Sequence, residues 1–177
     1  METALLTDSL PADVAGWWVS EKYDGVRAIW TGTKLLSRHG KDLKAPAAFT
    51  RHFPNRRLDG ELWMGNGTFD QLVSTIQKAG SDWNGVRFMV FDLAETGTVE
   101  ERIKETHRIC DCKWPVVVVN HRQLTSHDDL TEMERQIVTR GGEGCVIRRP
   151  GSPYRPGRMG DVIKVKRLVA DLDRWQG

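Results

Sequence analysis

Short apolar or alternating runs of strand length recur along the whole chain, and they constrain its fold more than any other feature of the sequence. Glycines and prolines fall singly or in short clusters between these runs, where they are typical of turns. Runs that alternate apolar and polar side chains, or stay apolar for a few residues, indicate β-strands. We expect strands at residues 17–21, 26–30, 34–37, 57–63, 86–93, 116–120, 144–148 and 161–167.

Helical periodicity is less frequent along the chain. Apolar residues three or four positions apart predict helices over residues 69–79, 99–110 and 128–139. Strands that follow one another directly near the start of the chain, through tight turns such as residues 23–25, favour antiparallel pairing. The sequence therefore predicts an α+β fold of antiparallel sheets flanked by helices, formed as a single domain over residues 1–177.

The composition is that of a globular protein. Of the 177 residues, 39% are hydrophobic and 28% are charged, which argues against disorder. Residues 1–16 lack the basic cluster and apolar stretch of a signal or transit peptide, and nothing requires a membrane, so we expect a cytoplasmic protein. Cys110, Cys112 and Cys145 have no paired spacing and are expected to be reduced thiols.

The total charge does not identify a partner. The chain has 26 basic and 24 acidic residues, and the net charge of +2 is too balanced to indicate nucleic acid. A nucleic-acid partner would have to bind a local patch. The most basic stretch runs from Arg148 to Arg167, where Asp161 is the one acidic residue.

Four charged segments interrupt or end the apolar runs. The first is EKYDGVR at residues 21–27, in which Lys22 stands at the end of an apolar strand. The second is LDGEL at residues 58–62, where a glycine separates two acidic residues. A solvated turn explains each segment when it is taken alone, so neither identifies a site by itself.

The other two segments lie near the end of the chain. The third is GGEGCVIR at residues 141–148, which puts Glu143 between glycines and also fits a helix C-cap followed by a turn. The fourth is DVIKVK at residues 161–166, whose strand periodicity places Lys164 and Lys166 on one face. Two neighbouring ammonium groups suit a phosphate ligand, although lysines also protect edge strands.

In this order, the four segments resemble the nucleotidyltransferase motifs that DNA ligases, RNA ligases and mRNA-capping enzymes share. The resemblance extends from Trp18 to Arg167 and includes SRHG at residues 37–40 and FMVFDL at residues 88–93. It is closest to the small ATP-dependent DNA ligases of bacteria and phages. It implies a nucleotidyltransferase (ATP-grasp-like) fold and an adenylation domain that acts on ATP.

The resemblance implies that Lys22 attacks ATP and carries AMP as a covalent lysyl-AMP. The attacking amine must be neutral. A free lysine has a pKa of about 10.4, so the site has to supply roughly 4–5 kcal/mol or react through a small neutral fraction. Nearby cations favour the neutral amine, and Arg27, Lys164, Lys166 and a bound Mg²⁺ are the candidates.

The resemblance also implies a set of phosphate and metal contacts. Lys164 and Lys166 would contact the α-phosphate, and Glu61 would bind the ribose hydroxyls. Mg²⁺, for which Mn²⁺ can substitute, prefers hard oxygen ligands. Its candidate ligands are Asp24, Glu61 and Glu143, with Asp24 orienting the loop and a metal-bound water.

Further residues match family positions around the nucleotide base and the DNA. Phe91 would stack on adenine, with core packing as the alternative, and the backbone of Glu21 would read the adenine edge. Arg27 and Arg38 match arginines that contact the nucleotide or the DNA 5′-phosphate. His39 replaces the asparagine that is more frequent in this loop.

Two more arginines fall where the family often carries this residue. They are Arg102 and Arg158, and Arg158 is a candidate for DNA binding. A surface helix or loop explains either of them equally well.

The expected function is that of an ATP-dependent DNA ligase core, which passes AMP to the 5′-phosphate of nicked double-stranded DNA before phosphodiester formation. DNA would be bound through its phosphates. The alternatives are an RNA ligase, an mRNA-capping type of nucleotidyltransferase, and a non-catalytic nucleic-acid-binding relative.

Full ligases of the family continue into an OB-fold domain, whose further basic motif helps to orient pyrophosphate. This chain ends at Gly177 without that motif. We therefore expect a monomeric adenylation domain that has no OB-fold domain and seals nicks poorly by itself.

Overall fold

The computed structural model describes residues 10–110, 114–155 and 160–166, and the chain divides into two compact units. Unit 1 contains residues 1–23 and 120–177, and unit 2 contains residues 24–119. The chain therefore passes from unit 1 to unit 2 after Tyr23 and returns after Val119. That both units belong to one domain stays a prediction.

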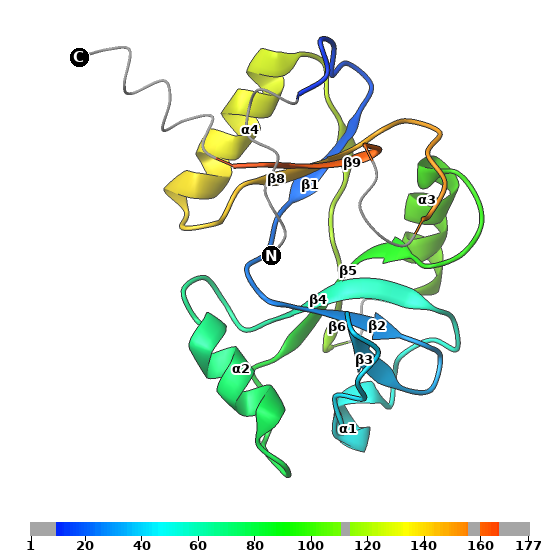
Figure 1. Ribbon diagram of the computed structural model, residues 1–177, viewed down its shortest axis with the longest axis vertical. Helices are drawn as coiled ribbons and strands as arrows, with labels where there is room; N and C mark the ends of the chain where they lie inside the picture. The colour runs from blue at the N-terminus through cyan, green and yellow to red at the C-terminus, as the bar shows by residue number, and fades with distance from the viewer. Residues whose placement is uncertain (1–9, 111–113, 156–159, 167–177) are drawn as a thin grey trace. The chain divides into compact units, whose positions relative to one another are not determined.

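Unit 1 is built on an antiparallel sheet in the order β7-β1-β8-β9. Helix α4 lies against this sheet (Figure 1). The core of unit 1 combines Leu130 and Ile137 of α4 with Val19 and Ile147 of the strands. The elements are β1 (Trp18–Glu21), β7 (Arg122–Gln123), α4 (His127–Thr139), β8 (Cys145–Arg148) and β9 (Val162–Val165).

Both ends of α4 are capped by the residues around it. At the start, the side chain of Ser126 accepts a hydrogen bond from the backbone N–H of Asp129. At the end, the N–H groups of Gly141 and Gly142 donate to the carbonyls of Val138 and Ile137, both over 2.9 Å. This paired arrangement is a Schellman motif, so the expected helix C-cap in the glycine-rich segment is confirmed.

Unit 2 is built on a sheet in the order β3-β2-β4-β5-β6. Neighbouring strands are antiparallel except β5 and β6, which are parallel. Parallel neighbours need a long crossover connection, and helix α3 (Val99–Ile109) lies in it. The strands are β2 (Val26–Trp30), β3 (Leu35–Ser37), β4 (Leu58–Trp63), β5 (Arg87–Leu93) and β6 (Val116–Val118).

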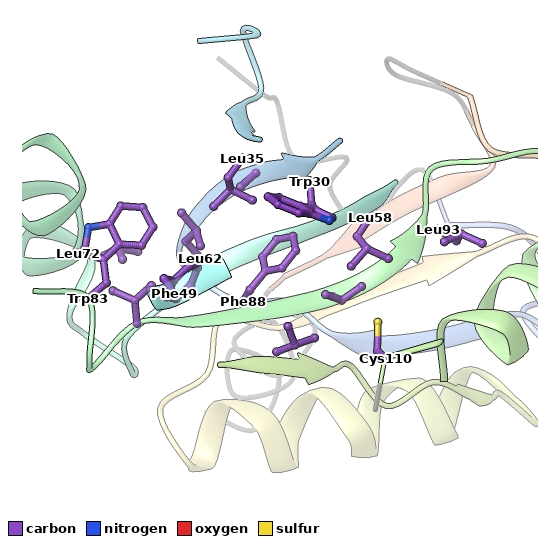
Figure 2. Packing of buried hydrophobic residues seen from close by; sticks show 14 residues of the cluster. Trp30, Leu35, Phe49, Leu58, Leu62, Leu72, Trp83, Phe88, Leu93 and Cys110 are labelled. Atoms are coloured by element: carbon purple, nitrogen blue, oxygen red, sulfur yellow. The ribbon is translucent and has the colours of Figure 1, made fainter. Parts of the chain in front are cut away.

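The core of unit 2 fills one face of its sheet. Figure 2 shows Trp30, Leu58 and Phe88 in this core, which also includes Phe49 of α1 (Ala47–Thr50) and Leu72 of α2 (Phe69–Gln77). Since side chains alternate along a strand, the other face of the sheet carries the residues between these core positions. That second face holds three of the predicted site residues, Arg27, Glu61 and Phe91.

The predicted α+β class is confirmed, and each expected strand and helix corresponds to one in the structure. Two short elements were not predicted, α1 and β7. They are too short for a hydrophobic period, and both residues of β7 are exposed. Within the described ranges, no helix has the length and apolar character needed to cross a membrane.

Candidate active site

The face of the unit 1 sheet that lies away from α4 carries the lysines of the fourth segment. Ile163 and Val165 are buried in the core, whereas Lys164 is partly exposed. Lys164 pairs in register with Val146 of β8, so both side chains share the face opposite the core. The predicted alternation along β9 is confirmed.

Lys22 meets Glu143 and Lys166 at the end of β1. The backbone N–H of Lys22 donates to the Gly144 carbonyl over 2.8 Å, which continues the pairing of β1 with β8. The Lys22 Nζ donates to one carboxylate oxygen of Glu143, and the Lys166 Nζ donates to the other. One carboxylate therefore bridges two ammonium groups, and the cluster keeps a net positive charge.

The residues on either side of Lys22 belong to a separate polar group. Arg140 Nη2 donates to Glu21 Oε2 over 2.6 Å, which ties the end of α4 to the end of β1. Burial raises the pKa of Tyr23 to about 12, and the negative charge of Glu21 adds to the effect. The Tyr23 phenol therefore stays protonated at neutral pH.

The described cysteines are buried. They are Cys110 and Cys145, and Cys112 lies outside the described residues. Burial, together with the negative charges of Glu134 and Glu21, raises the pKa of Cys145 to about 12. Because thiolates are the reactive form, Cys145 is unreactive at neutral pH.

Arg27 is held by a buried carboxylate in unit 2. Its Nε donates to Asp59 Oδ1 over 3.0 Å and its Nη2 to Asp59 Oδ2 over 2.6 Å. The Asp59 side chain is 1% exposed, whereas that of Arg27 is 44% exposed. This bidentate contact fixes the guanidinium while part of it remains accessible.

Phe91 and Glu61 lie beside Arg27 on the same face of the sheet. Arg27 pairs in register with Glu61, and its Cζ lies 5.6 Å from the centroid of the Phe91 ring. Phe91 is partly exposed and does not belong to the buried core cluster. Phe91 therefore lies outside this core cluster, and adenine stacking stays a prediction.

The glycine of the first charged segment allows close approach between β4 and the chain after Lys22. A Cβ atom at Gly25 would lie 2.1 Å from the Leu62 carbonyl oxygen and 2.8 Å from Glu61 Cγ. Any side chain would displace the backbone. Gly25 is therefore required by packing within unit 2.

The remaining predicted site residues are placed as follows. Asp24 is exposed and immediately precedes Gly25. Arg38 is exposed in the turn after β3, which is closed by a hydrogen bond of 2.9 Å from Gly40 N–H to the Ser37 carbonyl. Arg158 lies outside the described residues.

A family model tests the resemblance that the four segments imply. The model for the ATP dependent DNA ligase domain matches residues 10–166. The chain belongs to this family. The matched range contains all four charged segments of the ligase domain, and it includes residues of both units.

A DNA ligase of Haemophilus influenzae is 33% identical to this ligase domain over 158 residues. The alignment covers 86% of this chain and 59% of that ligase. The chain therefore spans less than two thirds of the length of this relative.

Solved ligase structures share the fold of the chain. A structure from a study of DNA binding with a minimal scaffold by Lig E DNA ligases is 32% identical, with a TM-score of 0.84, and covers 94% of this chain and 68% of that one. Chlorella virus DNA ligase-adenylate is 20% identical with a TM-score of 0.77 and the same two coverages, 94% and 68%. Bacteriophage T7 DNA ligase in complex with ATP is 15% identical with a TM-score of 0.65, covering 87% of this chain and 63% of that one. The predicted ligase-type nucleotidyltransferase fold is thus confirmed.

The acidic residues of the ligase domain suit a metal only in combination with other ligands. In the part of the chain that the structure describes, no group of three or more His, Cys, Asp or Glu side chains could hold a metal ion. Mg²⁺ usually binds through one or two carboxylates, with substrate phosphates and water as its other ligands. The Glu143 carboxylate could serve as one such ligand. Mg²⁺ binding by this domain remains a prediction.

Three contacts of the ligase domain were not predicted. Asp59 holds Arg27, and Arg140 holds Glu21. Arg102, which the sequence left open as a surface residue, is 3% exposed in its side chain and pairs with Asp92 over 2.7 Å. The sequence contained these charges, but no local period indicates which of them are partners.

Proposed function

We propose that this ligase domain adenylates its own Lys22. The Lys22 Nζ forms a bond to the α-phosphorus of ATP, the bond from that phosphorus to the pyrophosphate oxygen breaks, and the amine proton passes to solvent. AMP remains on the lysine as a phosphoramide. The observation that carries the proposal is the ion pairing of Lys22 with Glu143 beside Lys166 in a chain of the ligase family.

The bridging carboxylate keeps a partner when Lys22 reacts. Removing one member of a partly buried ion pair leaves the other charge uncompensated, which is costly. Here Lys166 remains on the second oxygen of Glu143 when the Lys22 amine becomes neutral. The Glu143 carboxylate favours the charged form of Lys22 and the neighbouring Lys166 cation disfavours it, and Glu143 keeps Lys166 as its partner once the Lys22 amine is neutral.

Lys164 and Lys166 supply positive charge for the α-phosphate in this proposal. Fixed cations stabilise the negative charge on phosphate oxygens during transfer. Glu143, with Asp24 and Glu61 as further candidate ligands, would hold Mg²⁺ or Mn²⁺. When bound, the metal would neutralise phosphate oxygens further.

The residues of unit 2 would bind the nucleoside. Phe91 offers a partly exposed ring for adenine, Glu61 would bind the ribose hydroxyls, and the Glu21 backbone would read the adenine edge. Arg27 is oriented by Asp59 and its side chain is 44% exposed, so its guanidinium can reach a phosphate. Arg38 would contact the nucleotide or the DNA 5′-phosphate.

The later reaction steps would use nicked double-stranded DNA. The 5′-phosphate would attack the α-phosphorus of AMP and displace Lys22, and the 3′-hydroxyl would then displace AMP and close the phosphodiester. We propose that the chain acts as a monomeric part of such a ligase. Family membership and the identity to two DNA ligases support this substrate over RNA or an mRNA cap.

The first step is tested by incubation with α-labelled ATP and Mg²⁺, followed by denaturing gels and a mass measurement that locates the adduct. We expect covalent AMP on Lys22, no label on Lys22→Ala, and no label from GTP. Label on another lysine, or wild-type labelling of Lys22→Ala, would contradict the proposal. Labelling by GTP would favour a capping enzyme.

Matched variants separate chemistry from folding. Lys104→Ala removes an exposed lysine from α3 and should label like the wild type. Lys22→Ala should stay folded, because Glu143 retains Lys166 as its partner. Equal unfolding midpoints of these variants would show that lost label reflects a lost nucleophile.

A further inference from the structure

An arginine on unit 2 is held by two tryptophans that the proposed adenylation does not use. Arg87 is the first residue of β5 and pairs in register with Trp63, the last residue of β4. Its Cζ lies 5.6 Å from the centroid of the Trp63 ring and 5.4 Å from that of the Trp114 ring. Both distances lie within the range of about 6 Å at which indole rings attract cations. The two rings therefore restrict where the guanidinium lies.

The Arg87 guanidinium keeps its hydrogen-bond donors in this arrangement. A cation–π contact uses the face of the indole, whereas the five N–H donors lie in the guanidinium plane. In residues 10–110, 114–155 and 160–166, no hydrogen bond or ion pair involves the Arg87 side chain, and the residue is exposed. The donors are therefore available to a ligand that offers acceptor oxygens.

Trp114 makes an apolar surface beside these donors. The residue is 54% exposed, although a large aromatic ring in a monomeric domain is more often buried. Exposed aromatic rings next to cationic side chains are used by proteins that bind nucleic acids, where the ring packs on a base or sugar and the cation meets phosphate. The combination of Arg87 and Trp114 has this chemistry.

The pair of Arg87 and Trp63 shares a sheet face with the proposed nucleotide residues. Met89 pairs in register with Glu61, which in turn pairs with Arg27. Trp63, two residues after Glu61 on β4, and Arg87, two residues before Met89 on the antiparallel β5, form the next row on the same face. Successive rows on one face are about 7 Å apart along the strands. The tryptophan-held arginine is therefore one row away from Glu61.

We propose that Arg87, oriented by Trp63 and Trp114, binds a backbone phosphate of the DNA substrate. The identity of the ligand as DNA rests on the proposed function, since the 5′-phosphate of a nick has to reach the AMP on Lys22. Duplex DNA carries one phosphate charge for about every 1.7 Å of its axis, so a duplex at Glu61 brings other phosphates within reach of the next row. A planar guanidinium recognises phosphate oxygens through two parallel hydrogen bonds.

The test is the binding of a fluorescent nicked duplex, followed by anisotropy over a series of salt concentrations. Arg87→Gln removes the charge and is expected to weaken binding by about 3- to 10-fold near physiological salt. A plot of the logarithm of the association constant against the logarithm of the salt concentration should become less steep, by about one unit of slope. Arg87→Lys keeps the charge but loses the planar fork, and we expect an intermediate affinity.

The tryptophan is tested as a positioning residue. Trp114→Ala should weaken DNA binding, and Trp114→Phe should restore most of the affinity because a ring remains. If Trp114 acts through Arg87, the double variant with Arg87→Gln should bind no more weakly than Arg87→Gln alone. If the affinity losses of Trp114→Ala and Arg87→Gln add fully in the double variant, Trp114 does not act by positioning Arg87. An unchanged salt dependence of DNA binding in Trp114→Ala would overturn that role as well.

Arg51→Gln is the matched control. Arg51 is an exposed arginine at the C-cap of α1 in unit 2, and its loss should change neither affinity nor slope. Wild-type affinity and slope in Arg87→Gln would overturn the proposal. It would also be overturned if Arg87→Gln weakened labelling by ATP alone, or if the wild-type chain did not bind the duplex.

Labelling with ATP, measured without DNA, separates this inference from the proposed function. A chain that binds the duplex through Arg87 but never takes up label would refute adenylation and leave the phosphate site standing. A chain that takes up label on Lys22 but binds DNA independently of Arg87 would refute the phosphate site and leave adenylation standing.

Discussion

Gly144 shows how a single residue brings the charged segments of unit 1 together. Its carbonyl accepts the Lys22 N–H, and its φ of +137° is a backbone conformation that side-chain-bearing residues avoid. A Cβ atom at this position would lie 2.4 Å from the Val165 carbonyl oxygen. The absence of a side chain therefore lets β9, with Lys166 after it, pack beside the end of β8.

We expect Gly144→Ala to lower the free energy of unfolding by about 3 kcal/mol or more, because backbone strain and the collision with β9 add. Gly151→Ala is the control, since Gly151 has a φ of +70° but no atom within 4 Å of an added Cβ. That change should cost only about 1–2 kcal/mol. Urea unfolding measures both values, and equal losses would contradict the steric explanation.

At the scale of elements, a bidentate ion pair joins β7 to the first turn of α4. Arg122 donates to the two carboxylate oxygens of Asp129 over 2.8 Å and 2.7 Å, and the Thr125 N–H donates to the same carboxylate over 2.9 Å. The hydrogen bonds from Arg122 and then from Thr125 lower the pKa of Asp129 from 3.8 to about 2. The short strand is thus fixed to the helix by charge as well as by backbone pairing.

This ion pair predicts a dependence of stability on pH. Because the pKa of Asp129 is lower in the folded state, its contribution is fully present above 3.8 and is lost as the pH falls toward 2. At about pH 6, Asp129→Asn should cost up to about 1 kcal/mol, as is usual for partly exposed pairs. The difference from wild type should shrink below pH 3.8 in denaturant titrations.

Asp128→Asn is the control for this experiment, since Asp128 also lies in the first turn of α4. A loss of the same size and pH dependence in Asp128→Asn would assign the effect to the helix dipole instead of the Arg122 pair.

At the scale of the whole molecule, the proposed ATP residues are divided between the two units. Lys22, Glu143 and Lys166 belong to unit 1, whereas Arg27 and Phe91 belong to unit 2. The chain crosses between the units twice. The role proposed for each residue can therefore be tested by a variant within its own unit.

We expect saturating ATP, added without Mg²⁺ so that Lys22 is not adenylated, to raise the melting temperature of the chain. At a ligand concentration of about 100 times Kd, the gain is about 2.7 kcal/mol. Phe91→Ala and Lys166→Ala should each reduce the ATP-induced shift several-fold, whereas Lys104→Ala should not. A full shift in either of the first two variants would contradict the role proposed for that residue in binding ATP.

The local pattern of the sequence determined the strands, the three longer helices and the alternation of Lys164 with buried residues. Each of these depends on periods of two or about four residues, which are visible over a short stretch. The order of the charged segments led to the ligase family. The same pattern could not indicate β7, which is two exposed residues long and exists only because β1 lies beside it.

Only the tertiary structure decided which charges are partners. Lys22 and Glu143 are 121 positions apart, and Arg27 and Asp59 are 32 apart. Their contacts follow from the registers of β1 with β8 and of β2 with β4. In the same way, Arg87 meets Trp63 because β4 and β5 pair at that row. Such registers depend on the packing of each sheet against its core, which no single segment of the sequence contains.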